Sequence, residues 1–213
     1  MTRRISCGVA TGADAVFVVD RVSVPDGLSR FAFPTIAGRH LQEGVEEVPA
    51  KALLAPYDLE GELLPETELG PLADFLGRPD NRVRLESRTC VSRKPWYAFH
   101  DSFPIQDMMQ PKLLCKDIAS EPFFVVDQGG EFVPRHSVYY IVPNAPEDLA
   151  TLAQYLNSEP ARAFLKSHSQ RAANGFFRLQ SRVLKQVPIP DSLELVGEAS
   201  GQLGLDGALV EAG

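Results

Sequence analysis

Two stretches of the chain carry side chains that suit contact with nucleic acid. Around the first, RKPWYAFH, stand the basic and planar residues Arg88, Arg93, Lys94, Trp96, Tyr97, His100 and Lys112. Arginine can bind a guanine edge through two hydrogen bonds, lysine neutralises phosphates, and planar rings stack on bases. Trp96 is the only tryptophan of the chain. Ordinary core packing is an equally open explanation for Trp96 and Tyr97, because large aromatic side chains are mostly buried.

The second stretch, SQRAANGFFRLQSR, contains five further DNA-compatible residues: Arg171, Asn174, Arg178, Gln180 and Arg182. Asparagine and glutamine are the natural bidentate partners of adenine edges. Asn174 and Gly175 predict a turn, which would project its neighbours outward so that Arg171 and Arg178 could both reach one groove. The alternative is a solvated basic turn whose two phenylalanines lie in the core.

Charge is unevenly distributed along the chain. The formal net charge is −7, yet residues 162–185 contain six lysines and arginines and no acid, and residues 78–116 contain eight bases against four acids. Residues 43–74 hold nine acids and one lysine, and the segment after Pro190 holds five acids and no base. This pattern favours a basic face on an acidic protein, although a solvated surface with uneven charge would give the same counts.

The usual catalytic and metal-binding patterns do not occur in the sequence. The GVATG loop is neither a GxGxxG fingerprint nor a phosphate-binding P-loop, and no GxSxG or HExxH pattern is present. The three cysteines form no Cys-x-x-Cys pair and the four histidines are scattered, so we predict no catalytic residue and no metal site. We also expect reduced thiols, a cytoplasmic location, no secretory signal and no membrane span.

The hydrophobic patterns predict an α+β fold. Strands are expected at residues 15–19, 31–36, 51–57, 112–116, 123–126 and 137–142, with two strands around a turn in the first segment, ISCGVATGADAVFVVD. Helices are expected at residues 69–76, 81–88, from 146 onward and from 159 to 168, with Leu149, Leu152, Leu156, Phe164 and Leu165 facing the core. Mixed or antiparallel sheets would thus form the N-terminal and central parts, with helices concentrated toward the C-terminus. We expect one domain over residues 1–190 and a flexible, acidic, glycine-rich tail over 191–213.

The order of several short motifs resembles the TaqI-like C-terminal specificity domain of adenine-specific DNA methyltransferases. GVATGADAVFVVD is similar to the GIxTGxNxAFxID opening of that family, FPTIAGRHL to its "RGRDI" segment, and SRKPWYAFH to its Arg…Trp-Tyr stretch. PKLLCKDIA is similar to its "PKI" strand. SVYYIVP, LAQYLNSEPARAFLKS and GFFRLQSRVLKQVPIP resemble its closing strand, "LNS" helix pair and "LPIP" ending. FPTIAGRHL keeps only Gly-Arg of its motif, and VPIP has valine in place of leucine.

The resemblance implies a target-recognition domain whose catalytic domain is not in this chain. In such enzymes a separate domain binds S-adenosylmethionine and carries an (Asn/Asp)-Pro-Pro-(Tyr/Phe) motif, and this chain contains no Pro-Pro pair. The chain would be a separated domain, a stand-alone subunit or an excised fragment. It would bind double-stranded DNA and a methyltransferase catalytic domain or subunit, with no cofactor and no membrane of its own.

We expect seven residues to contact DNA: Arg88, Arg93, Lys94, Trp96, Arg171, Asn174 and Arg178. We expect four residues to shape backbone turns: Gly8, Thr11, Gly12 and Gly38. Two rival functions stay open. One is a protein-interaction subunit that docks a separate methyltransferase and touches DNA little. The other is an unrelated small enzyme, against which the missing catalytic patterns count.

Overall fold

Contacts divide the chain into two compact units. The computed structural model describes residues 2–41 and 50–189. Unit 1 comprises Met1–Gly8, Ile36–Val48 and Asp107–Gly213, and unit 2 comprises Val9–Thr35 and Pro49–Gln106. The predicted domain over 1–190 therefore contains two units that are interleaved along the sequence. The predicted flexible tail lies outside the described residues.

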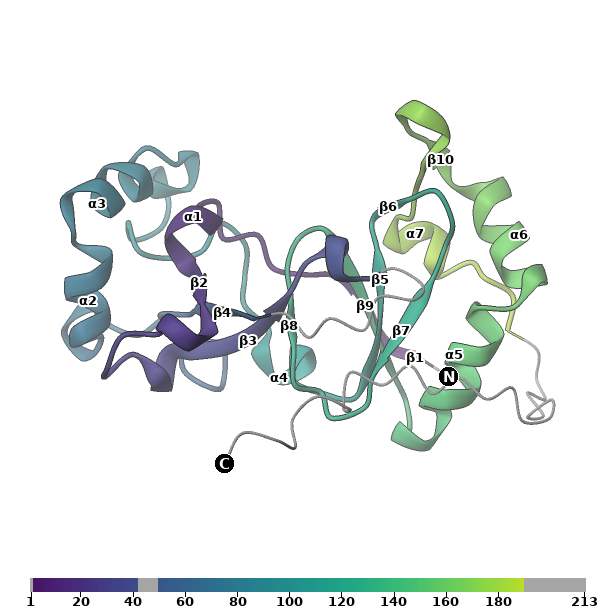
Figure 1. The fold of residues 1–213 in the computed structure, drawn as a ribbon, viewed down its shortest axis with the longest axis horizontal. Coiled ribbons are helices and arrows are strands. Elements are labelled where there is room, and N and C mark those ends of the chain that lie inside the picture. Colours follow the sequence, from purple (N-terminus) through teal and green to yellow (C-terminus); the bar gives the residue numbers. More distant parts are fainter. Residues whose placement is uncertain (1, 42–49, 190–213) are drawn as a thin grey trace. The chain divides into compact units, whose positions relative to one another are not determined.

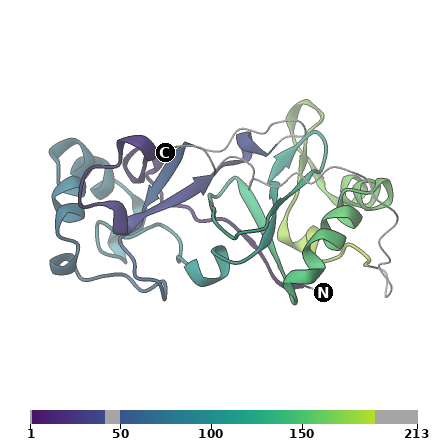
Figure 2. The ribbon, with the colours of Figure 1, turned by 60° about the horizontal axis from the view of Figure 1, so that its bottom comes forward.

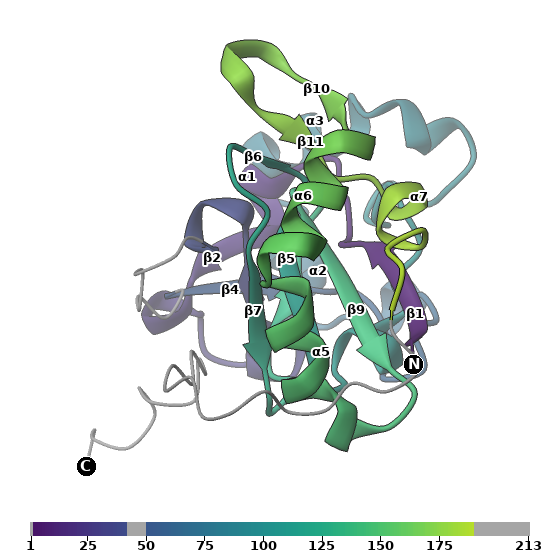
Figure 3. The same cartoon turned by 90° about the vertical axis from the view of Figure 1, so that its right-hand side faces the viewer.

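Unit 1 is built on an antiparallel sheet with the strand order β1-β9-β5-β7. Its strands are β1 (Thr2–Cys7), β9 (Val138–Pro143), β5 (Lys112–Lys116) and β7 (Phe124–Asp127). The helices α5 (Leu149–Leu156), α6 (Glu159–His168) and α7 (Ser181–Leu184) cover one face of this sheet (Figures 1 and 3). β1 lies at one edge of the sheet, and β9 is its only partner strand within residues 2–41 and 50–189.

The core of unit 1 lies between this sheet and its helices. Alternate residues of the strands, among them Leu113, Cys115 and Ile141, pack against the apolar faces of α5, α6 and α7. Leu149, Leu152, Leu156 and Leu165 are buried as the sequence predicts, and Phe164 is partly buried against the same cluster. Each buried leucine stabilises the fold by about 1.5–3 kcal/mol relative to exposure.

A smaller antiparallel sheet of unit 1 has the order β10-β11-β6. It contains β10 (Gln170–Arg171), β11 (Phe177–Arg178) and β6 (Ile118–Ala119). β8 (Val133–Pro134) follows the Gly129–Gly130 turn, where Gly130 has a φ of 67°. Glycine adopts a positive φ without steric strain, so Gly130 suits this turn.

Unit 2 combines three antiparallel strands with short helices. β2 (Val18–Asp20), β4 (Lys51–Leu54) and β3 (Ala32–Ile36) lie side by side in that order (Figures 1 and 2). The helices are α1 (Asp14–Phe17), α2 (Pro71–Leu76) and α3 (Pro79–Glu86), and α4 (Ile105–Met108) spans the boundary between the units. The rings of Phe17, Tyr57 and Phe103 surround Phe99 at centroid distances of 4.9–5.4 Å.

Single 3-10 turns complete the described part of the fold. They are Arg21–Ser23, Ser29–Phe31, Gly38–His40, Glu66–Glu68, Thr89–Ser92, Pro146–Asp148 and Ala173–Gly175. No helix within residues 2–41 and 50–189 is both long enough and apolar enough to cross a membrane.

The α+β class is confirmed, but two details of the prediction are wrong. Helices occur in both halves of the chain and are not concentrated toward the C-terminus. The first segment is not a pair of strands around a turn, because β1 and β2 belong to different sheets and residues 14–17 form a helical turn. There the hydroxyl of Thr11 donates to Asp14 at 2.6 Å and accepts from the Ala13 N–H at 3.0 Å. Such local side-chain bonds compete with strand pairing.

Two glycines of the GVATG loop are required by its backbone. Gly12 has a φ of +75°, a conformation that side chains with a Cβ rarely adopt. A Cβ on Gly8 would lie 2.4 Å from the carbonyl oxygens of Pro134 and Arg135. Both positions therefore shape the backbone, as the sequence predicts.

Candidate nucleic-acid interface

The β10–β11 hairpin presents the second predicted stretch. Its turn contains Asn174 at φ 60° and Gly175 at φ 78°, and the N–H of Ala172 donates to the carbonyl of Phe176 at 2.7 Å. Asparagine and glycine tolerate positive φ better than other residues, which explains why the chain reverses here. The hairpin extends past the end of α6 (Figure 3). The predicted turn is confirmed.

Arg171, Asn174 and Arg178 are exposed on this hairpin. None of the three side chains has a hydrogen bond or an ion pair with another residue in the ranges 2–41 and 50–189. Leu179, which follows them, is fully buried and anchors the hairpin to the core of unit 1. The exposed side chains of Arg171, Asn174 and Arg178 are therefore attached to a segment that is anchored in the core, and their donors are accessible to a ligand.

The strand register separates the two arginines. Arg178 lies opposite Gln170 on one side and Ile118 on the other, whereas Arg171 lies opposite Phe177. Directly opposed residues share a face of an antiparallel sheet, and successive residues alternate between faces. Arg171 and Arg178 therefore start from opposite faces of the small sheet. The expectation that both arginines reach one groove stays a prediction.

Helix α7 continues the basic surface after the hairpin. Arg182 lies within α7 and Lys185 is its C-terminal cap, and both are exposed. Neither has a partner among the residues that the structure describes. Val183 and Leu184 are buried in the core of unit 1, so the helix is fixed and its cations face outward.

Arg88, from the first predicted stretch, is engaged inside unit 2. Its guanidinium donates to the carbonyls of Leu85, Thr11 and Ala98 at 2.7–2.9 Å, and also to the carbonyl of Trp96. Burial lowers the pKa of Arg88. Its role in the structure is to hold three backbone segments together, and its predicted contact with DNA stays a prediction.

The other three selected residues of the first stretch differ in their polar contacts with the rest of unit 2. Lys94 donates to the carbonyls of His100 at 2.8 Å and Phe99 at 3.2 Å. The Trp96 indole donates to Glu66 at 3.3 Å, and the Arg82 guanidinium lies 3.7 Å from the centre of its ring. Arg93 is exposed, without a partner among the described residues.

Lys112 is not available to a ligand, which corrects its grouping with the basic and aromatic stretch. It is fully buried and pairs with the equally buried Asp127 at 2.5 Å. The seven selected residues thus form two sets: Arg88, Arg93, Lys94 and Trp96 in unit 2, and Arg171, Asn174 and Arg178 on one hairpin of unit 1.

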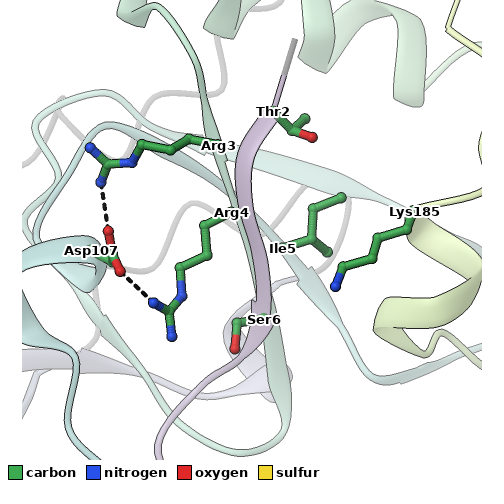
Figure 4. A pocket seen from close by; sticks show the side chains of 7 residues that line it. All are labelled: Thr2, Arg3, Arg4, Ile5, Ser6, Asp107 and Lys185. Carbon is green, nitrogen blue, oxygen red and sulfur yellow. Dashed lines mark hydrogen bonds and ion pairs between the residues drawn. The ribbon is translucent and has the colours of Figure 1, made fainter.

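Sequence reasoning missed a cationic hollow beside β1. This hollow, of about 810 Å³, is lined by residues 2–6 together with Asp107 and Lys185 (Figure 4). Asp107 accepts from Arg3 at 2.6 Å through one oxygen and from Arg4 at 2.5 Å through the other. The adjacent arginines Arg3 and Arg4 were the only sign of this site in the sequence. The carboxylate that binds them, Asp107, lies more than 100 residues away.

A second hollow, of about 420 Å³, lies within unit 2. Gly12, Arg84, Arg88 and His100 are among its lining residues. No group of three or more His, Cys, Asp or Glu side chains that could hold a metal ion occurs in residues 2–41 and 50–189. The three cysteines form no disulfide with one another.

Two curated relatives cover most of the chain. The Type II methyltransferase M.PaeR7I of Pseudomonas aeruginosa is 30% identical over 189 residues, which are 88% of this chain and 32% of the relative. The Type II methyltransferase M.BstVI of Geobacillus stearothermophilus is 26% identical over 200 residues, which are 94% of this chain and 35% of the relative. The chain thus spans about a third of the length of these relatives.

The family comparison covers the C-terminal hairpin and the aromatic stretch alike. Residues 74–189, more than half of the chain, match the model of the TaqI-like C-terminal specificity domain. The match begins in α2 and ends after α7, so it includes β5, β7, β9 and the helices that cover them. The chain therefore belongs to the family of TaqI-like C-terminal specificity domains.

Proposed function

We propose that the chain is the sequence-specific DNA-binding domain of an adenine-specific DNA methyltransferase of a restriction-modification system. Residues 1–190 would act together as one recognition domain in the cytoplasm. The observation that carries the proposal is the β10–β11 hairpin, whose exposed Arg171, Asn174 and Arg178 have no partners among the described residues. The hairpin lies within the family-matched region, and the relatives are named as methyltransferases.

The hairpin suits recognition of double-stranded DNA. Arginine can hold a phosphate or bind a guanine edge with two hydrogen bonds, and asparagine can do the same for an adenine edge. A turn of fixed geometry lowers the entropy that these side chains lose on binding. Residues 162–185 contain no acid, so no carboxylate of this segment repels the DNA.

Methyl transfer would be the task of a catalytic domain or subunit that this chain binds. That domain would hold S-adenosylmethionine and act on an adenine extruded from the duplex. The two hollows described above do not fit this cofactor: neither combines a glycine-rich loop with an acidic side chain for a ribose. The proposal therefore gives this chain no step in the transfer itself.

Salt-dependent DNA binding tests the proposal. Fluorescence anisotropy of a labelled duplex would be measured for the parent chain and for Arg171→Ala, Arg178→Ala and their combination. Each phosphate contact that is lost should reduce the log-log salt slope by about 0.9, so the double variant should lose up to about 2 units. An arginine that reads a guanine edge should instead cost about 1–3 kcal/mol at one base pair.

The single variants are needed because the two arginines start from opposite faces of the hairpin sheet. Arg21→Ala is the matched control: Arg21 is an exposed arginine of unit 2 without a partner among the described residues. Folded hairpin variants that bind DNA like the parent at every salt concentration would refute the hairpin as the contact surface. A parent chain that binds a catalytic subunit but shows no salt-dependent DNA binding would favour the protein-docking alternative.

A further inference from the structure

The free edge of β1 carries a concentration of positive charge. The hollow along residues 2–6 contains three cationic side chains, Arg3, Arg4 and Lys185, and one carboxylate, Asp107. Its lining therefore has a net charge of +2 in a chain whose overall charge is −7. Because β1 is an edge strand, no further strand of the described sheet closes this side.

A β-bulge brings both arginines to one side of β1. Strict alternation would direct the successive residues Arg3 and Arg4 to opposite faces of the sheet. The pairing of β1 with β9 shifts between Thr2 and Arg4, so Arg3 is the extra residue of the bulge. Bulges re-aim side chains in this way. Figure 4 shows both guanidiniums on the same side of the strand, facing Asp107.

The arginines keep donors for a further ligand. A guanidinium has five N–H groups, and one nitrogen of each arginine is bonded to Asp107. The side chains of Arg3 and Arg4 are 50% and 37% exposed, so the remaining donors can reach an anion. Asp107 holds the pair in place beforehand, which lowers the ordering cost of binding. Lys185 lies on the other side of β1 without a partner among the described residues (Figure 4).

We infer that the hollow along β1 provides two contacts for phosphate oxyanions, the Arg3–Asp107–Arg4 cluster on one side of the strand and Lys185 on the other, and that each takes a backbone phosphate of the duplex that the hairpin contacts. A guanidinium can bind two oxygens of one phosphate through parallel hydrogen bonds, and a lysine adds a mobile point charge. The run of exposed cations from Arg178 through Arg182 to Lys185 leads from the hairpin to this hollow. The inference rests on the proposed function, because it assigns further contacts to the same duplex.

Two variants of the full chain test the site in the salt-dependence assay. Lys185→Ala removes a side chain without a described partner, so it should leave stability within about 0.5 kcal/mol of the parent value. The triple variant Arg3→Ala/Arg4→Ala/Asp107→Asn removes the carboxylate with its partners and leaves no unpaired charge. Each variant should reduce the salt slope by about 0.9, and Arg21→Ala should not.

Inorganic phosphate, titrated at constant ionic strength, distinguishes the duplex backbone from a free phosphate compound. Loss of salt slope in both variants supports the site. Unchanged slopes in folded variants overturn it, and if the triple variant does not fold, Lys185→Ala decides. Saturable phosphate binding that the triple variant loses, with an unchanged DNA slope, would assign the hollow to a free phosphate and overturn the backbone contact. If the hairpin variants also leave binding unchanged, the proposed function itself fails.

Discussion

The guanidinium of Arg88 joins three separate segments of unit 2. Its acceptors are the carbonyl of Thr11 in the GVATG loop, that of Leu85 in α3, and those of Trp96 and Ala98 in the aromatic stretch. Arg88, which its sequence context predicts to contact DNA, therefore has a structural role in unit 2.

Arg88→Met should reduce the free energy of unfolding by about 2–4 kcal/mol, because several acceptors would lose their charged donor. Arg93→Met is the matched control, since Arg93 is exposed and lacks a partner among the described residues, and it should change the value by less than about 0.5 kcal/mol. Urea denaturation of both variants measures the difference. Equal stability of the two would contradict the role given to Arg88.

Tyr57 is a buried titratable residue in the aromatic core of unit 2. Its hydroxyl accepts the N–H of Phe99 at 2.9 Å, and burial raises its pKa from 10.0 to about 12. Between these values the folded protein keeps a proton that the unfolded chain has lost. The folded state therefore binds more protons in this range, and its stability must fall as the pH rises.

From pH 10 to pH 12 the free energy of unfolding should fall by about 2 kcal/mol through Tyr57, because part of the full difference, at about 1.36 kcal/mol for each pKa unit, develops below pH 10 and above pH 12. Tyr57→Phe leaves the Phe99 N–H without its acceptor and lowers stability at neutral pH, but its pH dependence in this range should be shallower. Denaturation curves at several alkaline pH values compare the two slopes. Identical slopes would show that Tyr57 is not the titrating group.

At the scale of elements, the pair Lys112 and Asp127 joins β5 to β7. The two residues lie directly opposite in the strand register, and neither side chain is exposed. Asp127 also accepts the N–H groups of Glu131 and Phe132 at 3.0 and 3.1 Å, which fixes the turn after β7. Burial lowers the pKa of Lys112, and the nearby Asp127 carboxylate partly offsets this effect.

Asp127→Asn should destabilise the protein by about 3–5 kcal/mol, because it leaves the Lys112 ammonium buried without its counter-charge. The matched control is Asp20→Asn, which breaks the exposed pair of Asp20 and Lys51 between β2 and β4 and should cost less than about 1 kcal/mol. Thermal unfolding of both variants provides the comparison. A small effect at Asp127 would mean that Lys112 loses its proton or reaches water.

Elements with a clear local pattern were predictable from the sequence. β5 occupies 112–116 and α6 occupies 159–168, both as expected from apolar runs and helix-start residues. The helical turn at residues 14–17 was not predictable, because their composition favours a strand. The hydrogen bond between the Thr11 hydroxyl and the Asp14 carboxylate stabilises the helical turn instead. The turn at Asn174 was predictable, but the faces of its arginines depend on strand register, which the turn residues alone do not specify.

At the scale of the whole molecule, sites made of residues that are neighbours in the sequence were predictable, and sites made by long-range pairing were not. The acid-free run 162–185 pointed to the hairpin because its residues are neighbours in the chain. The hollow beside β1 depends on a bulge in a strand pairing that spans more than 130 residues and on a carboxylate 104 residues from Arg3. Composition and motif order identify the family, but neither records such contacts.

The chain alone should not bind S-adenosylmethionine or methylate DNA. The reason is that the sequence lacks the Pro-Pro pair of the motif that the family resemblance assigns to the separate, cofactor-binding domain. Isothermal titration calorimetry with the cofactor should give no binding heat at micromolar concentrations. Transfer of a labelled methyl group to duplex DNA by the purified chain would contradict the prediction.

The interleaved order of the two units has a consequence for synthesis on the ribosome. All of unit 2 lies before residue 107, whereas β1 must wait for β9, more than 130 residues later, before it has a partner. At about 5–20 residues per second, that wait lasts about 7–28 seconds. During this time the backbone edge and the arginines of β1 are available to chaperones, and a nascent chain released early would contain unit 2 without the hairpin that we assign to DNA.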